Sequence, residues 1–312
     1  MDYTKMKVEC GRQGYARSFW DLMRGNNEAE QNLAGGRSPD QFSFALPNSA
    51  NDDLEEKIGE ESVMHQLASV FSQYEASGKI LASTSDPVAE FIPDGSALDT
   101  QDDAGNFTRI LIDKYRLAAL LRLPEVFIED AAFDMERYLI RQLGRAFARA
   151  EDRAFISGSG TDEPFGLLHD TEGAEEGASA SALSFDALID LYYSVKAEYR
   201  TNGVWLMNDM TALALKKLKD SAGSFLWSGD DDTFMGKPVM ITEHMPDAEA
   251  GAKPILFGDF SCYWIIRRSP VMIRVLKELF SMKDQIGYIA HEYIDGRLIR
   301  REAVKALSIT SA

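Results

Sequence analysis

Apolar residues recur at three- and four-residue spacing along residues 129–157, the strongest periodic pattern in the chain. Such spacing places the apolar side chains on one face of an α-helix. The segment has no proline, and the run Ser157-Gly158-Ser159-Gly160 marks its end. The pattern therefore predicts one helix of ~28 residues, about 40 Å long given the helical rise per residue.

Arginine occupies every fourth position along the same predicted helix, at Arg137, Arg141, Arg145, Arg149 and Arg153. Successive members turn by about 40° around the helix axis, so the row of arginines winds slowly around it. Two interpretations stay open. The row is either a solvated face with local ion pairs, for example between Arg149 and Asp152, or an electrostatic seam that meets acidic segments of other copies of the chain.

Shorter patterns predict both helices and strands elsewhere. Asn51 or Asp52 caps a helix from Leu54 to about Val70, and Ser184 caps another that ends near Tyr199. We expect further helical segments at residues 209–218 and 284–296, and strands at 204–208, 237–246, 254–260, 263–268, 271–278 and 303–310. Because these elements do not alternate in regular βαβ units, the predicted fold class is α+β.

Two segments have too few apolar positions for a core of their own. Residues 1–52 are rich in Gly, Asn, Arg and Ser apart from a short helical patch near Phe19, and we expect either a disordered tail or an arm that orders on another copy. Residues 79–113 read as two strands around a polar centre, and a hairpin of that length needs a partner surface in water. Its acidic tip, which includes Asp94, Asp99, Asp102 and Asp103, is a candidate partner for the arginines.

Composition narrows the class of protein. The chain has 312 residues, 45% of them hydrophobic, which allows one large core or two smaller ones. Its net charge of −17 is the reverse of the basic footprint of a nucleic-acid binder. Such a charge suits a container wall that touches packed DNA without holding it, although many cytosolic enzymes are equally acidic. Cys10 and Cys262 are too few for a disulfide framework, so we expect free thiols in a reducing compartment. No apolar run predicts a signal peptide or a membrane span.

The sequence contains no recognised catalytic or ligand-binding motif. Ser159 lacks the glycines of a G-x-S-x-G elbow, and His291 lacks the second histidine of H-E-x-x-H. No cysteine pair offers a zinc site, the acidic loops DTQDDAG and SGDDDTFMG miss the calcium-loop spacing, and no glycine-rich phosphate loop occurs. We predict no catalytic, cofactor or metal residues and no enzymatic activity. A soluble hydrolase or transferase with an unrecognised site is the alternative of a different class.

Several segments agree in order and spacing with a known family. SFWDLMRGNNEAEQNLAGG resembles the family's arm, and PVAEFIPDG resembles its extended loop. LGRAFARAEDRAFISGSGTDEPFGLL resembles its spine helix and the G-x-G turn that follows, and FMGKPVMITEHMP resembles part of its axial domain. Through these segments, residues 18–312 resemble the major capsid proteins of tailed bacteriophages, which have the Hong Kong 97 type fold.

The resemblance implies a domain plan for the chain. It consists of an N-terminal arm (1–52), a peripheral domain (53–78, 114–180 and 259–295) with a spine helix at 129–157, an extended loop (79–113) and an axial domain (181–258 and 296–312). The residues that it implies between subunits are Arg137, Arg141, Arg145, Arg149, Asp99, Asp102, Asp103, Phe91 and Trp20.

The resemblance also implies a role and partners. Copies of the chain would assemble, in the bacterial host cytoplasm, into the hexamers and pentamers of an icosahedral head shell, which becomes part of the virion. The shell would enclose double-stranded DNA with nonspecific contacts, without a membrane or a cofactor. A portal, and either a separate scaffolding protein or a maturation protease, would be further partners. An encapsulin-type nanocompartment, which shares the fold but encloses a cargo enzyme, is the alternative.

Two departures from the family pattern matter. Many relatives carry a coiled-coil scaffolding region ahead of the arm, whereas only a short stretch precedes Ser18, so we expect a separate scaffolding protein or a chain that starts near its processed end. Some relatives join subunits by a lysine–asparagine isopeptide bond. The segment from Ile80 to Asp113 contains no lysine and the segment Lys283–Gln285 no asparagine, so we predict no such cross-links.

Overall fold

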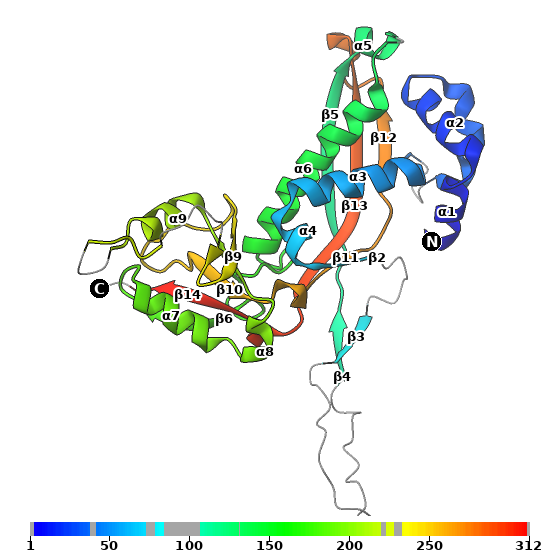
Figure 1. Cartoon of the computed structure of the whole chain (residues 1–312). Helices are drawn as coiled ribbons and strands as arrows, with labels where there is room; N and C mark the ends of the chain where they lie inside the picture. Colours follow the sequence, from blue (N-terminus) through cyan, green and yellow to red (C-terminus); the bar gives the residue numbers. More distant parts are fainter. Residues whose placement is uncertain are drawn as a thin grey trace, which may run out of the picture.

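The computed structural model describes residues 3–37, 42–72, 79–83, 107–130, 132–219, 223–227 and 233–310. These residues form two six-stranded sheets, each covered by helices, and a two-stranded stem that projects from the first sheet (Figure 1). Among the described residues, no helix is both long and apolar enough to cross a membrane.

The first sheet is built on β13 (Gln285–Leu298), a 14-residue strand with partners on both sides. β5 (Tyr115–Pro124) pairs antiparallel with it along one side. β12 (Met272–Leu276) and β11 (Tyr263–Arg267) share its other side, also antiparallel. The sheet ends at β1 (Phe44–Ala45), which pairs with β12, and at β2 (Ser69–Ser72), which runs parallel to β11.

Helix α6 (Met135–Ser157) covers one face of this sheet because one side of the helix is apolar (Figure 1). Leu139 and Phe147 on that side are fully buried and belong to the same core as the apolar residues of β13. α3 (Asn48–Glu61) packs along α6, and the five-residue α4 (Val63–Leu67) contacts α6 further along.

The N-terminal residues form a helical layer beside β12. It consists of α1 (Tyr3–Cys10), α2 (Gln13–Met23) and the 3-10 helix η1 (Asn27–Gly36), and its apolar residues join the core of the first sheet. The hydroxyl of Tyr288 on β13 donates a hydrogen bond to the carbonyl of Met23 over 2.9 Å. This segment is therefore attached to its own chain.

The second sheet has the strand order β6 (Glu175–Ala180), β14 (Val304–Ile309), β10 (Ile255–Gly258), β7 (Val204–Met207), β9 (Lys237–Ile241) and β8 (Thr233–Phe234). Its helices are α7 (Phe185–Ser194), α8 (Ala197–Arg200) and α9 (Asp209–Lys216). Trp205 and Phe257 lie at the centre of its core, with ring centroids 4.2 Å apart. The indole N–H of Trp205 donates to the carbonyl of Phe234, so burying the ring leaves no polar atom unsatisfied.

The projecting stem consists of β3 (Lys79–Ser83) and β4 (Phe107–Leu111), which pair antiparallel in the register Lys79↔Leu111 to Ser83↔Phe107. This confirms the hairpin predicted for residues 79–113 at its two ends. The remaining short helices are α5 (Glu125–Glu129), η3 (Phe260–Cys262), η4 (Ser281–Lys283) and η5 (Arg301–Ala303).

Three predicted helices differ from the structure. The segment 129–157 is not one helix, because Asp134 caps α6 by accepting a hydrogen bond from the amide of Arg137. The helix predicted from Leu54 to Val70 instead starts at Asn48 and stops before Ser62, whose hydroxyl caps α4. The segment 184–199 forms α7 and α8, although Ser184 caps α7 as predicted.

Two further expectations are wrong. Residues 284–296, predicted to be helical, form most of β13, since a central strand that is buried on both faces does not alternate between apolar and polar residues. Residues 3–36 are not loosely structured, because Met6, Phe19 and Leu33 are buried against the chain's own core. By contrast, the strands predicted at 204–208, 263–268 and 303–310 are confirmed.

Candidate intersubunit surfaces

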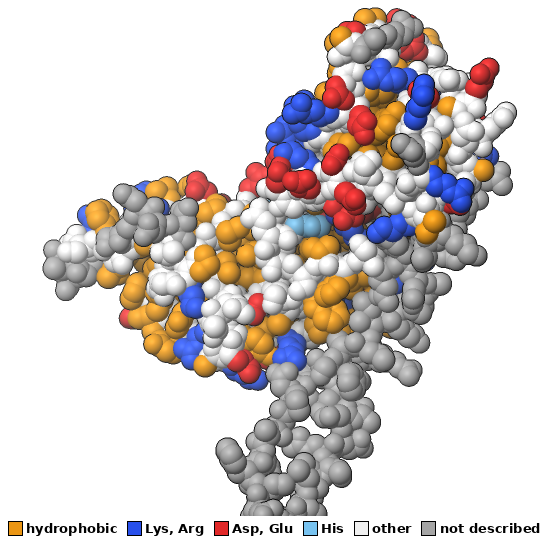
Figure 2. Space-filling model, turned by 45° about the vertical axis from the view of Figure 1, so that its right-hand side comes forward, with side chains coloured by type: hydrophobic (Ala, Val, Ile, Leu, Met, Phe, Trp, Pro, Cys, Tyr) orange, Lys and Arg blue, Asp and Glu red, His pale blue; other side chains and the backbone are white. Residues whose placement is uncertain are grey.

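The predicted row of arginines lies on the exposed side of α6, opposite its buried apolar face. All five arginines from Arg137 to Arg153 are exposed. Beside them runs α3, whose sequence NSANDDLEEKIGEE is strongly acidic. Figure 2 shows the result, in which basic and acidic side chains gather next to each other over this part of the molecule.

Within the described residues, the arginine row forms few ion pairs with its own chain, and these pairs are exposed. Arg145 Nε lies 3.1 Å from Glu61 Oε1, with half of the Arg145 side chain exposed. Arg153 Nη2 lies 3.5 Å from Glu163 Oε2, again at the surface. Exposed pairs of this kind contribute about 0–1 kcal/mol each, so the arginines keep most of their capacity to bind other carboxylates.

Between α3 and the first turns of α6 lies a charged groove of about 530 Å³. The residues that line it are Asp53, Glu56, Lys57, Glu60, Asp134, Glu136, Arg137, Ile140 and Arg141. Arg137 and Arg141 therefore lie among both acidic and basic side chains, and the surface around them is not uniformly basic.

The local pair suggested between Arg149 and Asp152 is wrong, because the Asp152 side chain points into the protein. Asp152 is 5% exposed and accepts hydrogen bonds from the Ser62 hydroxyl and from the amides of Val63 and Met64. These donors belong to the start of α4. Asp152 is therefore a structural residue, and it leaves Arg149 on the exposed face.

Trp20, predicted at a subunit contact, lies on α2 and packs within its own chain. Its ring meets that of Phe19 edge-on, with centroids 5.0 Å apart. Its indole also forms a hydrogen bond with Glu136 at the start of α6, which lowers the pKa of that carboxyl group against the larger, raising effect of burial. The other predicted contact residues, Phe91, Asp99, Asp102 and Asp103, lie outside the described residues.

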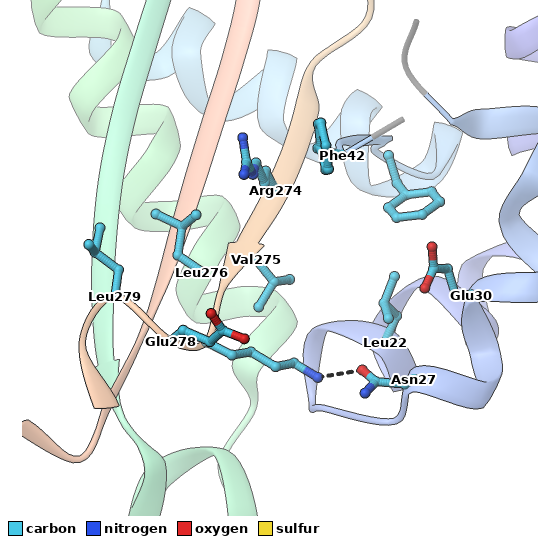
Figure 3. Close-up of a pocket in the computed structure, with 11 residues that line it drawn as sticks. Leu22, Asn27, Glu30, Phe42, Arg274, Val275, Leu276, Glu278 and Leu279 are labelled. Atoms are coloured by element: carbon cyan, nitrogen blue, oxygen red, sulfur yellow. Dashed lines mark hydrogen bonds between the residues drawn. The ribbon is translucent and has the colours of Figure 1, made fainter. Parts of the chain in front are cut away.

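A cavity follows the outer edge of β12, next to the N-terminal helical layer (Figure 3). It has a volume of about 810 Å³. β1 pairs only with Met272 and Ile273, so the edge of β12 beyond them faces the cavity. Lys277 spans the cavity and donates to Asn27 Oδ1 over 2.6 Å, while Arg274 stacks on the Phe42 ring.

A further exposed surface, which is apolar, was not predicted from the sequence. At the end of the first sheet, α5 and η4 meet through a hydrogen bond from the Glu125 amide to the Asp284 carbonyl. Four large apolar side chains are exposed on α5 and on the turn that contains η4, namely Val126, Phe127, Leu279 and Met282. We call these four residues the apolar apex. The segments lie more than 150 positions apart, so no local sequence pattern could have joined them.

Among the described residues, no group of three or more His, Cys, Asp or Glu side chains is placed to hold a metal ion. Comparisons with known proteins identify the family of the chain. The sequence model of the phage capsid family matches residues 43–309. The chain belongs to the phage capsid family. It matches no curated protein.

Solved capsid structures share the fold over most of the chain. The capsid of an empty gene transfer agent (GTA) particle, computed with C5 symmetry, is 34% identical, with a TM-score of 0.68 over 81% of this chain and 90% of that one. The native GTA capsid is also 34% identical, with a TM-score of 0.63 over 80% and 90% of the two chains. Chains from Microbacterium phage Oxtober96 (15% identity, TM-score 0.55) and Gordonia phage Cozz (14%, 0.54) cover 80% of this chain, and 91% and 86% of their own lengths.

These matches confirm the α+β fold of Hong Kong 97 type. Family membership makes this capsid protein a structural, non-enzymatic subunit of a shell of identical copies, and hence part of a particle.

Proposed function

We propose that this capsid protein forms the hexamers and pentamers of an icosahedral head that encloses double-stranded DNA. The observation that carries the proposal is the stem of β3 and β4, which pair with each other as a separate two-stranded sheet. An isolated two-stranded hairpin is marginally stable in water. A neighbouring copy in a shell would supply the surface that the stem and the segment beyond it need.

The distribution of charge suggests which surface of the neighbouring copy the stem and its acidic segment would contact. Residues 84–106 contain six acidic residues and no lysine or arginine. The exposed row on α6 offers Arg137, Arg141, Arg145 and Arg149. In this proposal the acidic segment of one copy, including Asp99, Asp102 and Asp103, lies on the arginine row of the next. Many weak pairs repeated around a shell would sum to a large effect, and they would weaken as salt screens them.

The remaining partners follow from the same proposal. DNA would be touched only nonspecifically, since a net charge of −17 opposes tight binding to phosphates. A portal, a separate scaffolding protein or a maturation protease would assist assembly in the host cytoplasm. The 34% identity to GTA capsids favours a gene transfer particle as a second candidate for the kind of head.

Charge reversal in the full-length chain tests the proposal. We expect the wild type to form rings or shells in negative-stain microscopy, and R141E/R149E to lower their yield about tenfold or more, since like charges would then face each other. Adding D102R/D103R should restore particles. The matched control is R17E, an exposed arginine on α2.

Two results would contradict the proposal. If the wild type forms neither rings nor shells, the proposal of hexamers and pentamers fails. If R141E/R149E assembles like the wild type and R17E, the shell stands but the arginine row is not the contact.

A further inference from the structure

A cluster of ionisable side chains lies buried where α4, α6, β11 and β13 meet. Its centre is a pair of carboxyl groups, Glu151 on α6 and Glu292 on β13, which are 2% and 0% exposed. The surface contacts proposed above do not use these residues.

The two carboxyl groups are within hydrogen-bonding distance of each other. If both were ionised, Glu151 Oε1 and Glu292 Oε1 would have no donor among the described residues. A carboxylate only accepts hydrogen bonds, so a bond between the two groups requires a proton on one of them. The geometry thus calls for one shared proton.

While His65 is neutral, the surrounding positive charge balances the pair only when that proton is present. Arg267 Nη1 on β11 lies 3.4 Å from Glu292 Oε2 and 3.7 Å from Glu55 Oε1 on α3. His65 Nε2 on α4 lies 2.5 Å from Glu151 Oε2. Asp152, the remaining charged group that acts on the pair, is occupied by donors from α4. One guanidinium thus serves the pair, and two ionised carboxylates would leave uncompensated buried charge.

The cluster lies at the root of the stem. α4 carries His65 and leads directly into β2, which pairs in parallel with β11, ending at Ser72 opposite Arg267. The chain continues from β2 towards β3. The contacts of His65 and Arg267 with the carboxyl pair therefore connect the root of the stem to α6 and β13.

We propose that the proton shared by Glu151 and Glu292 is a latch that holds α4 and β2 against α6 and β13, and that its loss loosens them. Burial raises the pKa of Glu151 to about 7 and that of Glu292 to about 8, and burial lowers the pKa of His65 to about 4. His65 is thus neutral near pH 7 and does not supply a second positive charge.

The sign of the pH dependence follows from these shifts. The pKa of the pair is raised while α4 and β2 are packed against α6 and β13. A carboxyl group of this kind stabilises the packed state fully below its ordinary pKa, and the stabilisation is lost as pH rises through the raised pKa. For the pair, the loss is complete at about pH 8. The lowered pKa of His65 acts in the opposite direction, but only between about 4 and its ordinary value near 6.5. Of these three groups, only the carboxyl pair contributes to the slope above about pH 6.5.

Amide hydrogen exchange of the full-length chain, corrected for the intrinsic pH dependence of exchange, tests the latch. In the wild type we expect the opening of residues 62–72 to increase about tenfold between about pH 6.5 and 7.5 and to level off above about 8. In E292Q the amide donates to an ionised Glu151 and so takes the place of the shared proton, and the increase should fall to about twofold or less. The control E176Q, an exposed position on β6, should keep the wild-type slope.

A flat wild-type profile, or an E292Q profile equal to that of the wild type, would overturn the proposal. Because E292Q could fail to fold, a second measurement uses the wild type alone. Infrared titration should detect a protonated carboxyl group at about pH 6.5 that disappears above about pH 8. If every carboxyl group is already ionised at about pH 6.5, there is no shared proton and no latch.

Discussion

Asp152 fixes a change of chain direction with one side chain. Its carboxylate accepts from the Ser62 hydroxyl at 2.5 Å and from two amides at 3.0 Å, at the break between α3 and α4. These donors are buried or partly buried, so water replaces the carboxylate poorly. A residue that looks like one more surface charge on an arginine-rich helix is therefore the anchor of the next segment.

We predict that D152A destabilises the protein by about 3 kcal/mol, because it leaves the hydroxyl and two amides of residues 62–64 without their acceptor. Denaturant unfolding of the purified protein would measure the change. The control is S157A on the same helix, whose exposed hydroxyl only bonds back to the Arg153 carbonyl, with an expected change below about 0.5 kcal/mol. Equal stabilities of D152A and S157A would refute the anchoring role.

At the scale of elements, the N-terminal helical layer depends on close packing at a glycine. A Cβ atom on Gly36 of η1 would lie 1.9 Å from the Tyr15 hydroxyl oxygen. That hydroxyl donates to the Ala45 carbonyl over 2.7 Å and so connects α2 to β1. A side chain on η1 would push Tyr15 away and break this connection.

We predict that G36A lowers the free energy of unfolding by about 1–3 kcal/mol through overpacking. Gly14, at the start of α2, has open space around it, so G14A should be neutral or stabilising by up to about 1 kcal/mol. Denaturant unfolding compares the two. If both variants change stability equally, helix propensity rather than packing explains the effect.

Sequence patterns predicted where helices and strands lie better than they predicted where each begins and ends, or whether a segment is a helix or a strand. The row of arginines and the strand at 304–309 follow from local spacing. The start of α6 is set by the Asp134 cap, and the apolar pattern that continues on both sides of Asp134 does not predict this start. The central strand β13 does not alternate between apolar and polar residues, because both of its faces are buried. The N-terminal residues fold because their apolar side chains pack into a core that later residues largely form. Such tertiary burial is invisible to a local pattern.

For the whole molecule, the candidate contacts divide into two kinds. The arginine row is continuous in sequence and was predicted from it. The apolar apex joins two distant segments, and nothing in residues 124–127 or 279–284 alone distinguishes it from ordinary turns. Met282 is 100% exposed and Leu279 is 70% exposed. Large apolar side chains gathered at one exposed end of a subunit indicate a contact surface.

The apex carries charges of both signs, with exposed Lys283 and Asp284 beside Met282 and Leu279. Such a surface is self-complementary, and in a shell of identical copies the available partner is another copy.

We predict that L279E/M282E lowers particle yield about tenfold or more, because charges would be buried between copies. Its unfolding midpoint should stay unchanged, since both positions are exposed. V8E, at a position 66% exposed on α1, is the control for a new charge at an exposed apolar site. Particle yield by sedimentation and the unfolding midpoint should be measured for all three proteins. A double variant that assembles as well as the wild type would show that the apex faces solvent in the shell.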